Sequence, residues 1–171
     1  GSFNKCLKVI SEKKKKAGTV FNPVFDFRKD NAADITVSLP YKRLGDVALI
    51  TENGRIEADD FFLSDTVNSS LVTKNGEIIY CMNTTGNCFI ENENGDITVR
   101  SLQCDYVDVK NKSGEISLTG SDIKGALNIK NGSGEFNIEN VECENLTAES
   151  DSGDLYLKNF LSRVAVTVKE N

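Results

Sequence analysis

The clearest pattern in the chain is a glycine followed by a polar residue and then by alternating apolar residues. It occurs six times, in the segments ENGRIEA, KNGEIIY, ENGDITV, KSGEISL, GSGEFNI and DSGDLYL. The glycines are Gly54, Gly76, Gly95, Gly114, Gly134 and Gly153, at spacings of 22, 19, 19, 20 and 19 residues. A nearly fixed period of this length is typical of architectures built from stacked repeats.

Four columns of apolar residues emerge when the repeats are aligned on the glycine. The positions two and four residues after it, and five and seven residues before it, are apolar throughout except at Ser69. Alternation at period two indicates strands with one buried face. Each repeat is therefore predicted to hold two short strands that meet at a polar corner, where glycine is suitable because it accepts positive φ angles.

The charges beside the glycine favour stacking between repeats over hairpins within them. Asn-Gly is also a hairpin signal, but the residues two before the first four glycines alternate in sign. They are Glu52, Lys74, Glu93 and Lys112. In a parallel stack these side chains would lie ~4.8 Å apart as attractive neighbours, which a hairpin does not explain.

The predicted fold is therefore all-β, a single-stranded right-handed parallel β-helix or β-solenoid. We expect six to seven coils of 19–22 residues, with a weaker third apolar face. The right hand is expected from the general handedness of parallel β connections.

The first 33 residues do not fit the repeat. An open solenoid needs caps at its ends, so residues 1–33 are predicted to be an N-terminal β cap. We expect a hairpin of residues 5–11 and 19–27 around the turn Lys13–Lys16, with Gly1-Ser2 as a tag remnant.

Residues 34–171 are assigned to the solenoid. The segment DITVSLP (34–40) is expected to enter the first coil with its apolar residues Ile35, Val37 and Leu39 facing inward. Near the other end, Val164, Val166 and Val168 either begin a seventh coil or cover the last one.

Composition restricts the classes of partner. The net charge is −6, with no His and no Trp, and nucleic-acid binding is not expected because it needs a basic surface. No window approaches 18 uninterrupted apolar residues, so we expect no direct insertion into a membrane. No signal peptide is present, and because Gly1-Ser2 resembles a cloning remnant, a removed N-terminal anchor stays open.

An acidic column is the most site-like feature of the repeat. A carboxylate directly follows five of the six glycines, at Glu77, Asp96, Glu115, Glu135 and Asp154. Stacked carboxylates repel, so calcium binding is one interpretation and a glycosidase pair is another. The interpretation we favour is a solvated acidic corner without a cofactor, because an active site usually occurs once and this feature recurs in every coil but the first.

The second repeat deviates most from the pattern and is the other candidate ligand face. It is longer than most and contains the acidic and aromatic residues Asp59, Asp60, Phe62 and Asp65. Insertions in solenoids map to loops, often on the binding face. A bulged corner is the simpler explanation. The aromatic residues Phe89, Tyr106 and Tyr156 fall in outward-facing or uncertain columns.

The cysteines fit a structural role. Cys88 takes an aliphatic position, while Cys104 and Cys143 share a column two coils apart. That separation is too large for a disulfide, so we expect buried, inert thiols, which fit a cytoplasmic protein or the envelope protein of an anaerobe.

The segment DITVSLPYKRLGDVALITENGRIEA, with the SGE and SGD corners that follow, resembles a bacterial family of adhesin-like β-solenoid domains of unknown function. The resemblance covers roughly residues 34–170. It implies a non-catalytic module of the cell envelope or cell surface, with a protein or surface glycan as partner, and it brings no catalytic residues. The alternatives are a carbohydrate-active enzyme or lectin on a β-helix, and a cytoplasmic location.

Overall fold

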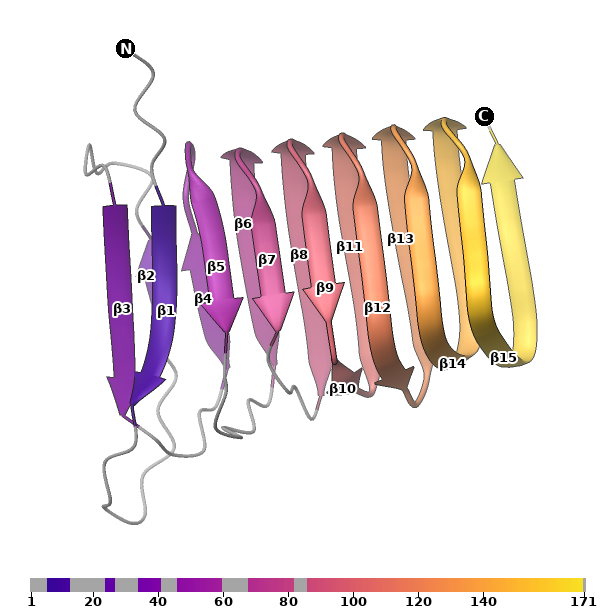
Figure 1. The fold of residues 1–171 in the computed structure, drawn as a ribbon, viewed down its shortest axis with the longest axis horizontal. Helices are drawn as coiled ribbons and strands as arrows, with labels where there is room; N and C mark the ends of the chain where they lie inside the picture. Colours follow the sequence, from indigo (N-terminus) through magenta and orange to yellow (C-terminus); the bar gives the residue numbers. More distant parts are fainter. Residues whose placement is uncertain are drawn as a thin grey trace.

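A computed structural model describes residues 6–12, 24–26, 34–40, 46–59, 68–81 and 86–170, with side chains from residue 46 onward except that of Asp59. Every strand pair in it is parallel. The strands stack as a β-solenoid of about six turns, drawn in sequence colours along its long axis (Figure 1). The described residues form no helix. The predicted fold class is confirmed, and the hand of the coil stays a prediction.

The described strands pair as one continuous sheet that wraps around the stack, and we call its two sides the pre-glycine sheet and the post-glycine sheet. The pre-glycine sheet contains β2 (Val24–Asp26), β4 (Val47–Ile50), β6 (Ser69–Asn75), β8 (Asn87–Asn94), β11 (Tyr106–Ser113) and β13 (Ala126–Ser133). The post-glycine sheet contains β1 (Cys6–Glu12), β3 (Asp34–Pro40), β5 (Arg55–Asp59), β7 (Ile78–Cys81), β9 (Ile97–Arg100) and β12 (Ile116–Ile123), with short β10 (Gln103–Cys104) beside β12. The last two strands, β14 (Phe136–Ser152) and β15 (Leu155–Glu170), run through both sheets.

The glycines lie one above another at a single corner of the stack. A Cβ built on any glycine from Gly76 to Gly153 in this column would meet the carbonyl oxygen of the glycine one coil earlier at 2.1–2.3 Å. Their φ angles lie between +117° and +147°, where L side chains rarely occur. Only glycine therefore fits this corner, and the alignment predicted from the sequence is confirmed.

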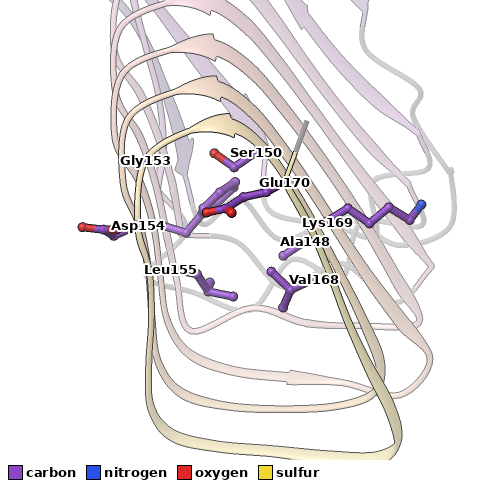
Figure 2. Close-up of a pocket in the computed structure, with 9 residues that line it drawn as sticks. Ala148, Ser150, Gly153, Asp154, Leu155, Val168, Lys169 and Glu170 are labelled. Carbon is purple, nitrogen blue, oxygen red and sulfur yellow. The ribbon is translucent and has the colours of Figure 1, made fainter.

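Each coil follows an elongated loop (Figure 2). The hydrophobic core lies inside these loops, between the pre-glycine and post-glycine sheets. All four predicted apolar columns are buried from Val47 to Ala148, and so are Leu102, Cys104, Ile123, Val141 and Cys143 of the weaker third face. The exception, Ser69, is buried as well because its hydroxyl hydrogen-bonds the Tyr80 hydroxyl across the core at 2.5 Å.

A polar column also lies inside, three residues before each glycine. It consists of Thr51, Thr73, Asn92, Asn111, Asn131 and Ser150, all buried. The amide nitrogen of each asparagine donates to the carbonyl oxygen of the glycine one coil earlier, at 2.8 Å from Asn92 and Asn131 and at 3.0 Å from Asn111. These bonds satisfy corner carbonyl groups that would otherwise be buried without a donor.

The N-terminal strands differ from the predicted hairpin. β1 pairs in parallel with β3 on one side and with β5 on the other, while β2 pairs in parallel with β4. Both sides of β1 are therefore occupied, and a β1–β2 hairpin is excluded. β3, which was expected to enter the first coil, lies beyond β1 at the end of the post-glycine sheet (Figure 1). The inward orientation of Ile35, Val37 and Leu39 lies outside the described side chains, and the domain boundary at residue 33 stays a prediction.

We expect Gly114→Ala to destabilise the protein by about 3 kcal/mol or more, because the new Cβ would meet the Gly95 carbonyl oxygen at 2.3 Å and the backbone has a φ of +123°. Gly120→Ala is the matched control, since its φ is +60° and no atom lies within 4 Å of the added Cβ. The control should cost about 1 kcal/mol. Urea unfolding followed by circular dichroism measures both, and similar midpoints for the two variants would contradict the stacked corner.

Tyr80→Phe should lower the free energy of unfolding by about 1 kcal/mol, because it removes one partner of the buried Ser69 hydroxyl. Ser69→Ala should cost less in the Tyr80→Phe background than in the wild type, which gives a coupling energy of about 1 kcal/mol in a double-mutant cycle. Additive effects of the two substitutions would show that the hydroxyl pair does not contribute to stability.

Candidate functional site

The acidic column follows the glycine corner along the stack. Backbone bonds place its members one coil apart. The N–H groups of Ile78, Ile97 and Ile116 donate to the carbonyl oxygens of Asp96, Glu115 and Glu135, each at 2.9 Å. Asp96, Glu115, Glu135 and Asp154 are exposed, and Glu77 is half-buried. The predicted column is therefore present, on the surface of the corner.

Several of these carboxylates contact different local partners. The Asp96 carboxylate accepts the Glu115 N–H at 2.8 Å, and the Glu115 carboxylate accepts the Asn137 amide at 2.7 Å. Glu77 lies 3.4 Å from the Arg55 guanidinium, and Asp154 accepts the Tyr156 hydroxyl at 3.2 Å. Among the residues that the structure describes, no three His, Cys, Asp or Glu side chains are placed to hold one metal ion. Calcium binding stays a prediction.

The candidate ligand face of the second repeat cannot be located. Asp59 is the last residue of β5, and its side chain lies outside the described part. Asp60, Phe62 and Asp65 lie outside the described residues altogether. This candidate therefore stays a sequence prediction.

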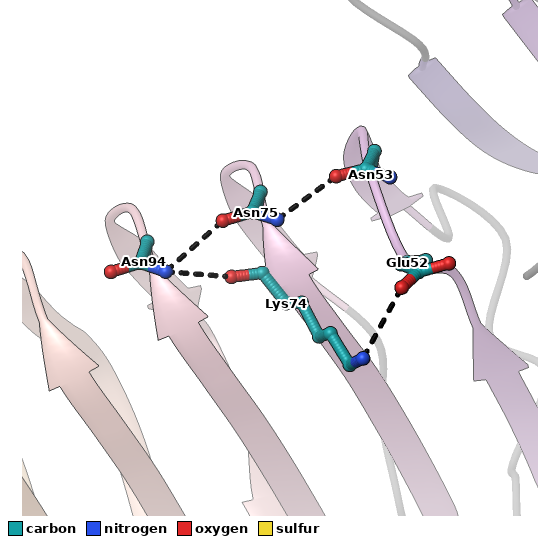
Figure 3. A network of polar contacts seen from close by, with 5 residues as sticks. All are labelled: Glu52, Asn53, Lys74, Asn75 and Asn94. Atoms are coloured by element: carbon teal, nitrogen blue, oxygen red, sulfur yellow. Dashed lines mark hydrogen bonds and ion pairs between the residues drawn. The ribbon is translucent and has the colours of Figure 1, made fainter.

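Polar ladders join the coils on the outside of the glycine corner (Figure 3). The Asn75 amide donates to the Asn53 side-chain oxygen at 2.9 Å, and the Asn94 amide donates to Asn75 at 3.0 Å. Lys74 pairs with Glu52 at 3.2 Å, which is the attraction predicted from the alternating charges. These contacts connect neighbouring coils, so we assign the corner a structural role.

Two of the aromatic residues noted in the sequence, Phe89 and Tyr106, meet on the outer face of the pre-glycine sheet, a contact that the sequence did not predict. The Phe89 side chain of β8 is 42% exposed, and its ring centroid lies 5.9 Å from that of Tyr106 in β11. The Tyr106 hydroxyl accepts the Asn128 amide at 2.7 Å, which fixes the tyrosine ring. The signal in the sequence was that Phe89 stands in an outward column with Ser70 and Asp108 as its register partners.

A shallow hollow of about 90 Å³ lies beside this pair. Its lining comes from β6, β8 and β11 and includes Ser70, Val72, Phe89, Glu91, Asp108 and Lys110. Asp108 and Lys110 form an ion pair at 3.3 Å. We call Phe89, Tyr106 and this hollow the aromatic face. It combines an exposed aromatic ring with the negatively charged Glu91 and Asp108 and the positively charged Lys110. This arrangement suits recognition of a partner better than proton transfer.

Three of the cysteines have the environment predicted for them. Cys88, Cys104 and Cys143 are buried free thiols, whereas Cys81 is half-buried. Burial raises the pKa of Cys88 well above its usual range, that of Cys104 to about 12 and that of Cys143 to about 11. A thiol attacks as its thiolate, so these three side chains are poor nucleophiles.

The remaining findings concern membrane spans and similarity to known proteins. No membrane-crossing helix occurs in the part of the chain that the structure describes. A family model described as Toastrack DUF4097 matches residues 4–170. Comparison with curated proteins gives no match, and comparison with solved structures gives none either.

Cys104 and Cys143 should resist iodoacetamide in the folded protein at pH 8.5. With pKa values of about 12 and about 11, under about one per cent of either thiol is ionised at that pH. Both should be labelled fully once guanidinium unfolds the chain, as measured by peptide mass spectrometry. Labelling of Cys143 at the same rate in the folded and unfolded states would contradict the inert environment.

Proposed function

The chain belongs to the Toastrack DUF4097 family, and from that membership and the geometry above we propose that it is a non-catalytic module that binds a protein or glycan partner through its aromatic face. The observation that carries the proposal is the exposed Phe89 ring, supported by a tyrosine whose own position is fixed by Asn128. An aromatic side chain whose position is already fixed loses little conformational entropy on binding, and such side chains are common anchors of binding surfaces.

The breadth of the aromatic face supports an extended contact. The side chains around Phe89 come from three neighbouring strands, β6, β8 and β11, and include the small polar Ser70, the apolar Val72 and the charged Glu91, Asp108 and Lys110. Polar groups around one aromatic anchor exclude water from its edges and select the partner. A partner that spans several coils could therefore use the aromatic face as its central contact.

A non-catalytic role agrees with the titratable groups of the described residues. Asp96, Glu115 and Asp154 of the acidic column each accept a hydrogen bond from a different local donor. A glycosidase instead directs two carboxylates at the same glycosidic bond. The three buried cysteines are poor nucleophiles. A lectin would use the same aromatic face for a sugar ring, so the alternative of a sugar-binding module is tested together with a protein partner.

The location that we propose is the bacterial cell envelope or cell surface. It rests on the resemblance of the repeat corners to adhesin-like domains of envelope proteins, with the cytoplasm as the alternative. An exposed face on an elongated, rigid stack would suit contact with another surface.

Co-sedimentation with bacterial envelope fragments tests the proposal. We expect the full chain to pellet with the fragments and Phe89→Ala to lose at least about tenfold in affinity, as for a central aromatic anchor. Ile79→Ala is the matched control, because Ile79 is a half-buried apolar residue of β7, between two inward residues, on the post-glycine sheet. The control should bind as the wild type does.

Two treatments of the fragments separate the kinds of partner. Periodate, which cleaves the vicinal diols of sugars, should abolish binding to a glycan, whereas a protease should abolish binding to a protein. The proposal fails if the wild type does not pellet, or if Phe89→Ala and Ile79→Ala behave alike.

A further inference from the structure

The last coil differs from the others in the apolar surface that it leaves in water. Seven large apolar or aromatic side chains are exposed among the residues whose side chains are described, and six of them belong to β15. They are Tyr156, Leu157, Leu161, Val164, Val166 and Val168. Val166 is 48% exposed and Val168 is 56% exposed, although their register partners one coil earlier, Leu146 and Ala148, are buried. A concentration of this kind marks an interaction site.

The outer edge of β15 is also an open strand edge. β14 pairs with β12, β13 and β15, whereas β15 pairs with β14 alone among the described strands. One row of backbone N–H and C=O groups along this strand of 16 residues is therefore left without a strand partner among the described residues. β15 is the last strand of the stack (Figure 1). Such an edge is a template for another strand.

A hollow of about 70 Å³ opens at this end (Figure 2). Its apolar walls are Phe136, Ala148, Leu155 and Val168, and Ser150 and Glu170 lie at one side. The volume is several times the space that one water molecule needs. In the interior of the stack, the corresponding space is filled by the inward side chains of the next coil.

The charges of the last two strands identify the kind of strand that fits. β14 has five carboxylates and no cation, whereas β15 has three cations and one carboxylate. Lys158, Arg163 and Lys169 each pair with a glutamate of β14 at 2.6 Å. Inside the stack, Glu149 is shared by a cation on either side, Lys130 at 3.5 Å and Lys169 at 2.6 Å. The cations of β15 have acidic partners on one side only.

We propose that the open edge of β15 binds an extended acidic strand of another protein, which adds in parallel as the next coil. Its alternate apolar side chains cover Leu157, Val166 and Val168 and fill the hollow. Its outward carboxylates pair with Lys158 and Lys169 and continue the ladder that Lys130, Glu149 and Lys169 begin. Parallel addition follows from the direction of every strand pair in the stack.

Charge disfavours a second copy at this edge. Two copies related by a two-fold axis would place β15 against β15 in antiparallel orientation. Both sides of that contact would carry Lys158, Arg163 and Lys169. Like charges placed across an interface suppress the pairing.

The test uses a labelled peptide with the sequence of residues 136–152, carrying C143S to prevent oxidation. This segment is the natural parallel neighbour of β15 and has the required alternation of apolar and acidic residues. Fluorescence anisotropy against the full chain should show saturable binding. The same peptide with E139K, E142K and E149K should bind at least about tenfold more weakly, since its charges are reversed.

Variants of the protein locate the contact. Lys158→Gln with Lys169→Gln should weaken binding roughly fivefold, since exposed ion pairs contribute modestly. Lys74→Gln with Lys110→Gln is the matched control, because it removes two exposed, ion-paired cations far along the stack. Val166→Lys should abolish binding, and urea unfolding verifies that each variant is folded. Phe89→Ala should leave peptide binding unchanged, which separates this edge from the aromatic face.

Three outcomes would overturn the proposal. One is the absence of saturable peptide binding to the folded wild type. Another is equal binding of the acidic and the lysine-substituted peptides. The third is a concentration-dependent dimer in sedimentation velocity that Val166→Lys abolishes, which would assign the edge to a second copy.

Discussion

Close backbone contact at the glycine corner is the constraint on which the rest of the structure depends. The carbonyl oxygen of one glycine occupies the position that a side chain of the next would need, at 2.1–2.3 Å from a Cβ. Each coil must therefore return a glycine to the same place after 19 to 22 residues. The registers of the strands that flank these glycines follow from this return, because the corner holds the strands on both of its sides in line.

The polar columns are a consequence of that register. A residue three positions before one glycine lies inside the corner, where its amide reaches the glycine carbonyl one coil earlier. A residue one position before lies outside, where asparagine and serine side chains bond from coil to coil. Recurrent polar residues in a repeat thus maintain its geometry, and their recurrence does not indicate a binding site.

The sequence was sufficient to predict the repeat part of the fold. Glycine spacing and period-two alternation are local signals, and each coil repeats them, so the buried columns from Val47 to Ala148 could be assigned in advance. The Ser69–Tyr80 bond could not, because it joins two columns across the core. Nor could the position of β1, since residues 1–33 carry no glycine register to align. The aromatic face depends on Phe89 and Tyr106 meeting across two strands, which no single repeat reveals.

The position of β1 also constrains the order in which the chain can fold during synthesis. β1 lies between β3 and β5, and Cys6 is in register with Asp34 on one side and with Arg55 on the other. The strand that leaves the ribosome early therefore waits for partners made 28 and 49 residues later. Assembly of the N-terminal end cannot proceed outward in chain order. β1 can complete its pairing only after β5 has been synthesised. The N-terminal end of the solenoid therefore forms through a long-range step that follows synthesis of the first glycine corner.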